Sequence, residues 1–360
     1  MSKNSKIKKR TVIISVITFS IASLFTAKAI YSKNLNESTN THQIKIGLSL
    51  DSLVIERWQT DRDIFVSKSK QLGAKVLVEK ANNDTNEQIR QVKSLIDEGV
   101  DVLVIVPHDS SAFQTILTIA KRKGIKVIAY DRLIKDSSVD LYVSFDNEKV
   151  GELMGQSLLK AAPKGNYLII NGGQEDYNTH LVNNGFKRVL KDSLDSGKIK
   201  ILNEVWATSW NEDVAYKCVD EALSKGEKID AIMCGNDRLA ESAIQALAER
   251  KLAGTIPVIG QDASLGGCQR VVESTQLMTI YKPIRPLAET AAEYAVKLAK
   301  NQRLSIKNTI YDGTSDIPFY VEDPITVYKN NMVSTVVKDN FHSINEIYIN
   351  VPKESWPTGN

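Results

Sequence analysis

The sequence predicts an α/β fold made of two doubly wound lobes, each a parallel sheet with helices on both faces. Short apolar runs rich in β-branched residues alternate with segments of helical periodicity along most of the chain. This alternation runs to about residue 146 and then starts again. A chain of 360 residues is also long for one hydrophobic core and about right for two domains.

The first series covers residues 44 to 130. Its second element has Ile64 and Leu72 at helical spacing and stops at Gly73, whereas residues 101–106 form a continuous apolar run typical of a buried parallel strand. The expected elements are a strand at Ile44–Leu50, a helix at Asp61–Leu72, a strand at Lys75–Val78, a helix at Asn86–Glu98, a strand at Asp101–Val106, a helix at Ser111–Lys123 and a strand at Lys126–Tyr130.

The second series begins after Asp146. The expected elements are helix Val150–Ala161, strand Asn166–Asn171, helix Asn184–Ser193, strand Lys198–Val205, helix Asp213–Ser224, strand Ala231–Cys234, helix Ala240–Arg250, and strands Pro257–Ile259 and Leu277–Tyr281. A helix at Leu287–Lys300 and an extended stretch at Phe319–Tyr328 follow, and we expect the end of the chain to cross back between the lobes.

We therefore expect four regions. Residues 1–40 are a signal or anchor segment with a tether, residues 41–148 with about 283–310 form the N-terminal lobe, residues 149–282 with about 311–345 form the C-terminal lobe, and residues 346–360 are a tail.

The basic excess of the chain is confined to its N-terminus. Residues 1–40 hold seven Lys or Arg and one Glu, which leaves 39 basic and 42 acidic residues in the remainder, a net charge of −3. A mildly acidic body offers no basic face to nucleic acid, so nucleic acid is not an expected partner.

The N-terminal segment resembles a targeting signal. A basic head from Lys3 to Arg10 precedes an apolar stretch from Val12 to about Ala29, and Ala27-Lys28-Ala29 has the small-x-small form of a cleavage site. The stretch is of marginal length for a spanning helix. We expect it to remain as an anchor, with the rest of the chain on the extracytoplasmic side; the alternative is a cleaved, secreted or periplasmic protein.

Neither the cysteines nor the histidines suggest a metal centre. Cys218, Cys234 and Cys268 form no C-x-x-C pair, and no cysteine follows the apolar segment to accept a lipid. The four histidines lack ligand spacing; His108 edges a strand end, where it is more often a satisfied turn residue. We expect no cofactor and no metal.

Charged, amide and aromatic residues follow most of the expected strands. Ligands of parallel sheets bind at the carboxyl ends of the strands, so these side chains are candidates for a site. They come from both lobes: Glu56-Arg57-Trp58, His108-Asp109, Asp131-Arg132, Asp176-Tyr177-Asn178, Trp206 and Trp210, Asn236-Asp237-Arg238, Gln261-Asp262 and Tyr281-Lys282. Such a set suits a neutral polyol, whose hydroxyls both donate and accept and whose C–H face stacks on indole. A phosphate ligand is disfavoured because no G-x-x-x-x-G-K or G-x-G-x-x-G motif is present.

Each candidate also has a purely structural interpretation. Asp131 and Arg132 could form a solvated turn, Trp58 could pack under the first helix, and Asp176 and Asp262 could cap the helices that follow them. One of Trp206 and Trp210 is expected in the core, and Trp210 is favoured as the exposed one. Carboxylates such as these could also serve a glycosidase, but nothing marks one of them as a raised-pKa acid.

Several longer motifs resemble the D-xylose-binding proteins of bacterial sugar importers. They are Glu56-Arg57-Trp58-Gln59, Ala129-Tyr130-Asp131-Arg132, residues 144–151 (SFDNEKVG), Gly260-Gln261-Asp262-Ala263 and Tyr281-Lys282-Pro283-Ile284, and the similarity runs from about Ile44 to Asp339. The resemblance implies a type I periplasmic-binding-protein fold, with a hinge and a central cleft that closes on one sugar.

By the same resemblance, ten residues contact D-xylose: Arg57, Trp58, Asp131, Arg132, Asp176, Asn178, Trp210, Asn236, Asp262 and Lys282. Three other residues depart from the expected pattern, namely Tyr177 between two contact residues, and Arg238 and Glu241 near the cleft rim.

The resemblance leaves two main roles open. The protein is either a membrane-anchored sugar sensor that signals to a membrane histidine kinase, or the substrate-binding component of an ABC-type xylose importer. The anchor without a lipid cysteine favours the sensor. The effector domain of a transcription factor shares this fold, but an apolar segment stands where its DNA-binding helices would be.

Overall fold

The computed structural model describes residues 42–53 and 56–357. The described residues from Ile44 onward form one compact unit. The expected signal or anchor segment, with its tether, lies outside the described residues. Among the helices of the described part, none has the length and apolar character needed to cross a membrane.

A seven-stranded sheet forms the first lobe, in the order β11-β12-β5-β4-β3-β1-β2. Its strands are β1 (Lys45–Leu50), β2 (Lys75–Lys80), β3 (Val102–Ile105), β4 (Lys126–Tyr130), β5 (Leu141–Phe145), β11 (Thr309–Tyr311) and β12 (Asp316–Glu322). All neighbouring strands run parallel except β11, which pairs antiparallel with β12.

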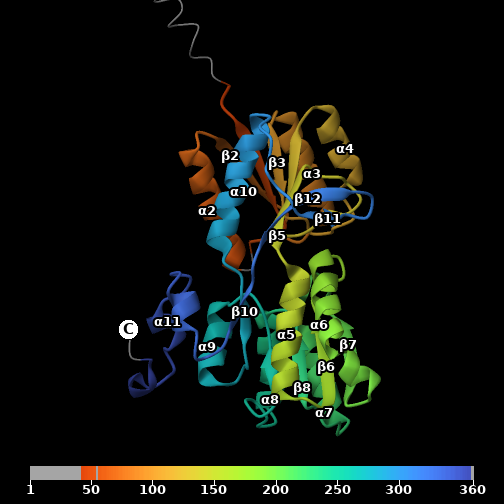
Figure 1. Cartoon of the computed structure of the whole chain (residues 1–360), viewed down its shortest axis with the longest axis vertical. Coiled ribbons are helices and arrows are strands. Elements are labelled where there is room, and N and C mark those ends of the chain that lie inside the picture. Colours follow the sequence, from red (N-terminus) through yellow and green to blue (C-terminus); the bar gives the residue numbers. More distant parts are fainter. Residues whose placement is uncertain (1–41, 54–55, 358–360) are drawn as a thin grey trace, which may run out of the picture. The chain divides into compact units, whose positions relative to one another are not determined.

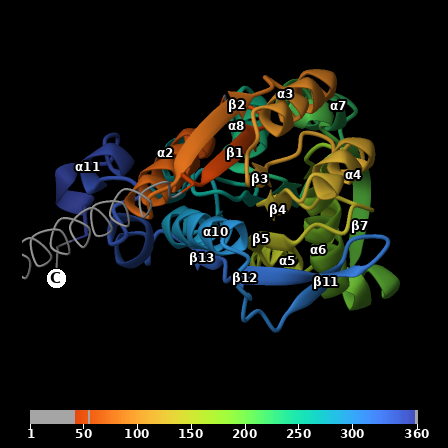
Figure 2. The ribbon, with the colours of Figure 1, turned by 90° about the horizontal axis from the view of Figure 1, so that it is seen from above.

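Helices cover both faces of this sheet. Helices α2 (Glu56–Gln71) and α10 (Ile284–Ala299) lie side by side over one face, and α3 (Thr85–Asp97) and α4 (Gln114–Arg122) cover the other (Figures 1 and 2). Side chains of β3 divide accordingly: Val102 and Val104 pack toward α2 and α10, and Leu103 and Ile105 toward α3 and α4.

The second lobe repeats this plan around a four-stranded parallel sheet, in the order β7-β6-β8-β9. The strands are β6 (Gly165–Asn171), β7 (Ile199–Trp206), β8 (Ala231–Cys234) and β9 (Val258–Ile259). The helices are α5 (Asn147–Ala161), α6 (Tyr177–Asp195), the 3₁₀ turn η1 (Thr208–Trp210), α7 (Asp213–Ser224), α8 (Asp237–Ala248) and α9 (Leu265–Glu273). Alternating side chains of β6 pack on α5 and α6 from one face and on α7 and α8 from the other. These two lobes confirm the α/β fold of two doubly wound units that the sequence predicts.

The last part of the chain connects both lobes. Strand β12 pairs with β5 in the first sheet, and β13 (Ile325–Val327), three residues later, pairs antiparallel with β10 (Thr279–Tyr281) beside the second. Residues 309–322 thus lie in the first sheet, whereas the sequence assigned residues from about 311 to the C-terminal lobe, because an extended stretch alone does not reveal which sheet it joins. The other lobe boundaries stay predictions.

Strand β5 and helix α9 are among the elements that the sequence-based prediction missed. Strand β5 is short and polar at Ser144, and α9 begins Leu-Gly-Gly, a sequence of low helix propensity that depends on the Ser264 side chain accepting from the Gly267 N–H at 3.1 Å.

After β13, the π-helical turn η2 (Val333–Val337) and α11 (Ile344–Ile347) pack in one cluster with α9, and the exposed 3₁₀ turn η3 (Lys353–Ser355) follows them. Ile347 and Tyr348, in the expected tail, are buried there.

Two glycines allow α5 and α6 to pack closely. A Cβ atom on Gly151 would lie 1.9 Å from the backbone oxygen of Val182, and one on Gly185 would lie 2.0 Å from that of Glu148. Backbone atoms cannot rotate aside as a side chain can, so these positions exclude any larger residue.

Gly151→Ala is therefore expected to lower the free energy of unfolding by about 2 kcal/mol or more, because the helices must move apart. Urea unfolding followed by circular dichroism measures the effect, with Gln156→Ala on the exposed face of the same helix as the control. Equal stability of the two variants would contradict this prediction.

Candidate functional site

The first lobe presents charged side chains after β1 and β4, two strands of its sheet. Arg57 and Trp58 lie in the first turn of α2, which follows β1. Asp131 and Arg132 directly follow β4. Both strand ends lie at the edge where ligands of parallel sheets bind.

In the second lobe, candidates begin or precede helices. Asp176 caps α6 by accepting from the Asn178 N–H at 3.0 Å, and Asn236 caps α8 by accepting from the Leu239 N–H at 2.9 Å. Asp262 does not cap the helix that follows it, since Ser264 does.

All ten residues predicted from the sequence line a single cavity of about 30 Å³. Three further residues line it that were not among the ten predicted contacts: Asn147, Thr179 and Gln261, of which Gln261 had been named with the strand-end candidates. Their signals were weak but present, because Asn147 and Gln261 lie inside motifs quoted for the resemblance and Thr179 follows Asn178.

Ion pairs organise the cavity wall. Arg57 Nη2 lies 2.7 Å from Asp131 Oδ2, Arg57 Nε lies 3.4 Å from Asp61 Oδ2, and Lys282 Nζ lies 3.2 Å from Asp262 Oδ1. Each carboxylate of the wall thus has a cation beside it, as buried charges require.

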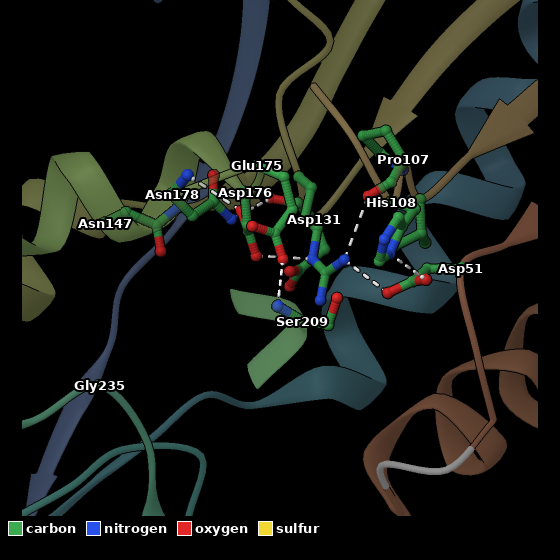
Figure 3. A network of polar contacts seen from close by, with 12 residues as sticks. Asp51, Pro107, His108, Asp131, Asn147, Glu175, Asp176, Asn178, Ser209 and Gly235 are labelled. Atoms are coloured by element: carbon green, nitrogen blue, oxygen red, sulfur yellow. Dashed lines mark hydrogen bonds and ion pairs between the residues drawn. The ribbon is translucent and has the colours of Figure 1, made fainter. Parts of the chain in front are cut away.

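Other contacts join the lobes. Arg132 Nε lies 2.7 Å from Asp176 Oδ2, and the Asn178 side chain donates to the Asp131 backbone oxygen at 2.8 Å. Figure 3 shows Asp131, Asp176 and Asn178 close together in this network. The site is therefore built from both lobes at once.

Electrostatics keep Asp131 ionised. Burial alone would raise the pKa of Asp131, but Arg57, Lys282 and Arg132 together hold it below its usual value. At Asp61 the effect of burial is larger than that of the Arg57 charge, so the pKa of Asp61 is raised to about 6. Asp131 thus presents a charged acceptor, and it does not suit the part of a general acid.

The backbone is strained at three of the ten positions. Asp131, Trp210 and Asp262 have φ values of 60°, 58° and 91°, a region that side-chain-bearing residues rarely occupy. The surroundings hold this conformation: the Asp131 N–H donates to the Val143 oxygen at 2.8 Å, and the Tyr142 hydroxyl donates to the Asp131 oxygen at 2.8 Å. Such strain is often found at ligand sites.

Several polar atoms at the cavity are left for a ligand. Among the described residues, the buried Nε1 atoms of Trp58 and Trp210 and Oε1 of Gln261 have no hydrogen-bond partner. Asp262 Oδ1 lies near Lys282 but without hydrogen-bond geometry. Two donors and two acceptors, beside two indole faces, fit a polyhydroxylated ring.

The residues that depart from the expected pattern have structural partners. Tyr177 packs with the first lobe's core residues, and Lys135 Nζ lies 5.0 Å from the centre of its ring. Arg238 pairs with Glu212, and Glu241 Oε2 lies 3.1 Å from Arg270 Nη1. Tyr177 therefore does not line the cavity, although the residues on either side of it do.

In the described part of the chain, no group of His, Cys, Asp and Glu is arranged to hold a metal ion. Cys218, Cys234 and Cys268 are buried and unpaired with one another.

Comparison with known proteins shows which family and which proteins this chain is similar to. Residues 46–303 match the periplasmic binding protein domain. The chain is 45% identical over 313 residues to the D-xylose-binding periplasmic protein of Escherichia coli K12, covering 87% of this chain and 95% of that protein. It is 44% identical over 314 residues to the protein of the same description from Haemophilus influenzae, with the same coverage. Among solved structures, an ABC transporter solute binding protein from Clostridium phytofermentans with bound β-D-glucose has a TM-score of 0.77, with 26% identity over 84% of this chain and 99% of that one.

Proposed function

The chain belongs to the periplasmic binding protein family, and on that premise we propose that it binds D-xylose in the cavity between its lobes. The relatives support a sugar ligand and an extracytoplasmic location, and they are binding proteins rather than enzymes. The observation that carries the proposal is the meeting around one cavity of ten side chains that follow the expected strands and that the resemblance identifies as sugar contacts.

The chemistry of the wall fits this ligand. Asp131 and Asp262 accept from sugar hydroxyls, Asn236 and Lys282 donate to them, and Trp210 stacks on a C–H face of the ring. Because the wall holds cations and carboxylates in pairs, it matches a neutral ligand rather than an anion.

Calorimetry with D-xylose, D-ribose and D-glucose tests the proposal. We expect D-xylose to bind most tightly, at roughly micromolar affinity or better, which is about 8 kcal/mol or more. Tighter binding of D-ribose or D-glucose would overturn the ligand assignment. No metal or nucleotide is needed in the assay.

We also propose that the lobes close on the sugar by hinge rotation. The cavity is small, at about 30 Å³, and its wall comes from both lobes, so we expect a sugar to enter while the lobes are apart. The segments that join the lobes, at residues 145–147, 281–284 and 322–325, are the expected hinge. Small-angle scattering should show a smaller radius of gyration with D-xylose than without it; an unchanged radius would count against closure.

For the biological role we propose a membrane-anchored sensor that presents its sugar-bound form to a membrane histidine kinase. Support comes from the sequence of residues 1–40, with its basic head and apolar stretch. The substrate-binding component of an ABC-type xylose importer is the alternative, and the relatives are equally consistent with it.

Two measurements separate these roles. N-terminal sequencing of the protein taken from cells decides whether the apolar segment is retained. Purification from solubilised membranes with D-xylose then identifies the partner. Recovery of a kinase with the retained anchor supports the sensor, whereas recovery of a permease, or a mature chain that starts near residue 30, supports the importer.

A further inference from the structure

Two residues that are not among the ten predicted contacts lie beside the sugar cavity. Asp51 follows β1 and His108 follows β3, and both line a second cavity of about 130 Å³ that adjoins the first through Arg132 and Trp210. Asp51 is buried, with 4% of its surface exposed. His108 Nδ1 lies 2.8 Å from Asp51 Oδ1, and His108 points toward that carboxylate in Figure 3.

The other oxygen of Asp51 binds the cavity residue Arg132. Arg132 Nη1 donates to Asp51 Oδ2 at 2.7 Å and to the Pro107 oxygen at 3.1 Å. Its Nε lies 2.7 Å from Asp176 Oδ2 in the second lobe. A continuous line of contacts thus runs from His108 through Asp51 and Arg132 to the opposite lobe.

The loop that carries His108 also touches the second lobe directly. The Ser110 N–H donates to the Glu175 backbone oxygen at 3.0 Å. The hydrogen bond to Asp51 raises the pKa of His108, burial and the Arg132 charge oppose this, and the Glu175 charge raises it further. Glu175 belongs to the second lobe, so its effect on His108 depends on the lobes being together.

We propose that Asp51 and His108 are positioning residues for the sugar site, which fix Arg132 against Asp176 and make sugar affinity depend on the protonation of His108. The inference rests on the proposed function. It extends the site beyond the residues that line the sugar cavity.

Charge balance sets the direction of the effect. The charged groups around His108 are the carboxylates of Asp51, Asp84, Asp109, Glu175 and Glu212 and the guanidinium groups of Arg132 and Arg238. Carboxylates predominate, so a protonated imidazole is favoured while the lobes are together.

Separation of the lobes removes Glu175 from His108 and Asp176 from Arg132. Opening takes the carboxylates of Glu175, Asp176 and Glu212 and the guanidinium of Arg238 away from this side of the site, a net loss of negative charge that lowers the His108 pKa. The accompanying loss of burial acts in the opposite direction, and we expect the change in charge to prevail. If the His108 pKa is higher in the closed form than in the open form, protonation of His108 stabilises the closed form. This stabilisation is complete at a pH below the open-form pKa, and it is lost as the pH rises through the closed-form pKa. Sugar affinity should therefore fall with rising pH.

Calorimetry of D-xylose binding from about pH 5.5 to about pH 8.5 tests this. We expect the affinity of the unsubstituted chain to fall by about three- to tenfold across the range, where tenfold corresponds to about one unit of pKa difference between the two forms. His108→Gln should remove most of that slope. Asp51→Asn should also bind about tenfold more weakly at every pH, because it deprives Arg132 of a carboxylate. The control is His42→Gln, an exposed histidine at the start of the described residues, which should keep the full slope.

The outcomes separate this inference from the proposed function. If the D-xylose affinity of His108→Gln changed with pH as much as that of the unsubstituted chain, the inference would be overturned and the proposed function would stand. Tight D-xylose binding that does not vary with pH would have the same consequence. Absence of D-xylose binding at every pH would overturn the proposed function. Thermal unfolding verifies that each variant folds; if Asp51→Asn does not, the His108→Gln slope decides alone.

Discussion

Asp131→Ala is expected to weaken D-xylose binding by more than about 2 kcal/mol, roughly 30-fold or more. The Asp131 carboxylate is buried, lies 2.7 Å from Arg57 Nη2 and is held ionised by three neighbouring cations. Its removal takes an acceptor from the sugar hydroxyls and leaves the Arg57 charge with less compensation in a closed cavity. Calorimetry at neutral pH gives the loss directly.

Two variants make the Asp131 result specific. Asp131→Asn preserves shape and removes only the charge, so it separates the electrostatic part of the loss. Asp63→Ala removes a carboxylate whose side chain is 69% exposed on α2, and it should bind as the unsubstituted chain does. A loss below about 0.5 kcal/mol for Asp131→Ala would mean that this carboxylate does not contact the sugar.

The sequence predicted the positions of the candidate residues because they depend on local rules. Apolar runs located the strands, and side chains after the carboxyl ends of parallel strands converge whatever the details of packing. Asp131 and Arg132 follow a strand whose bounds, Lys126–Tyr130, match the expected ones. The specific identification of these residues as sugar contacts came from the resemblance.

Pairings between lobes could not be predicted in the same way. Arg132 and Asp176 lie 44 positions apart in the sequence, and nothing local indicates that a guanidinium from one lobe meets a carboxylate from the other. The link from His108 through Asp51 is hidden for the same reason. His108 looked like an ordinary turn residue, because its contact is with Asp51, which follows the neighbouring strand β1 but lies 57 positions away in the sequence.

Local sequence rules do not tell which of two adjacent polar residues faces the cavity, and only the resemblance selected Asn236 over Asp237. Asn236 lines the sugar cavity, but its neighbour Asp237 does not. Asp237 accepts from Gln276 Nε2 at 2.7 Å and from Thr279 Oγ1 at 2.9 Å, and burial raises its pKa to about 7. The rotation of the first turn of α8 decides between the two, and that rotation is set by tertiary packing.

Of the two tryptophans near β7, the sequence favoured Trp210 for the site and left Trp206 out of the predicted contacts. Trp206 ends β7 with its ring centre 4.7 Å from that of His180, and it does not line the sugar cavity. Trp210 does line it, and the space for its ring is provided by Gly172, where a Cβ atom would lie 2.3 Å from Cη2 of the indole.

Trp210→Ala is therefore expected to weaken D-xylose binding by more than about 2 kcal/mol. The substitution removes both the aromatic stacking face and an indole N–H that has no hydrogen-bond partner within the protein. Trp206→Ala is the matched control and should change the affinity by less than about threefold. Substitution of Trp58 would be a less specific test. Trp58 is only 3% exposed in the core of the first lobe, and the Arg57 guanidinium lies 4.4 Å from its ring centre. Its removal should therefore lower the melting temperature as well as the sugar affinity. Calorimetry on the folded Trp210 and Trp206 variants decides: if Trp206→Ala lost the affinity and Trp210→Ala kept it, the stacking face would have to be sought on the other side of β7, away from the cavity described above.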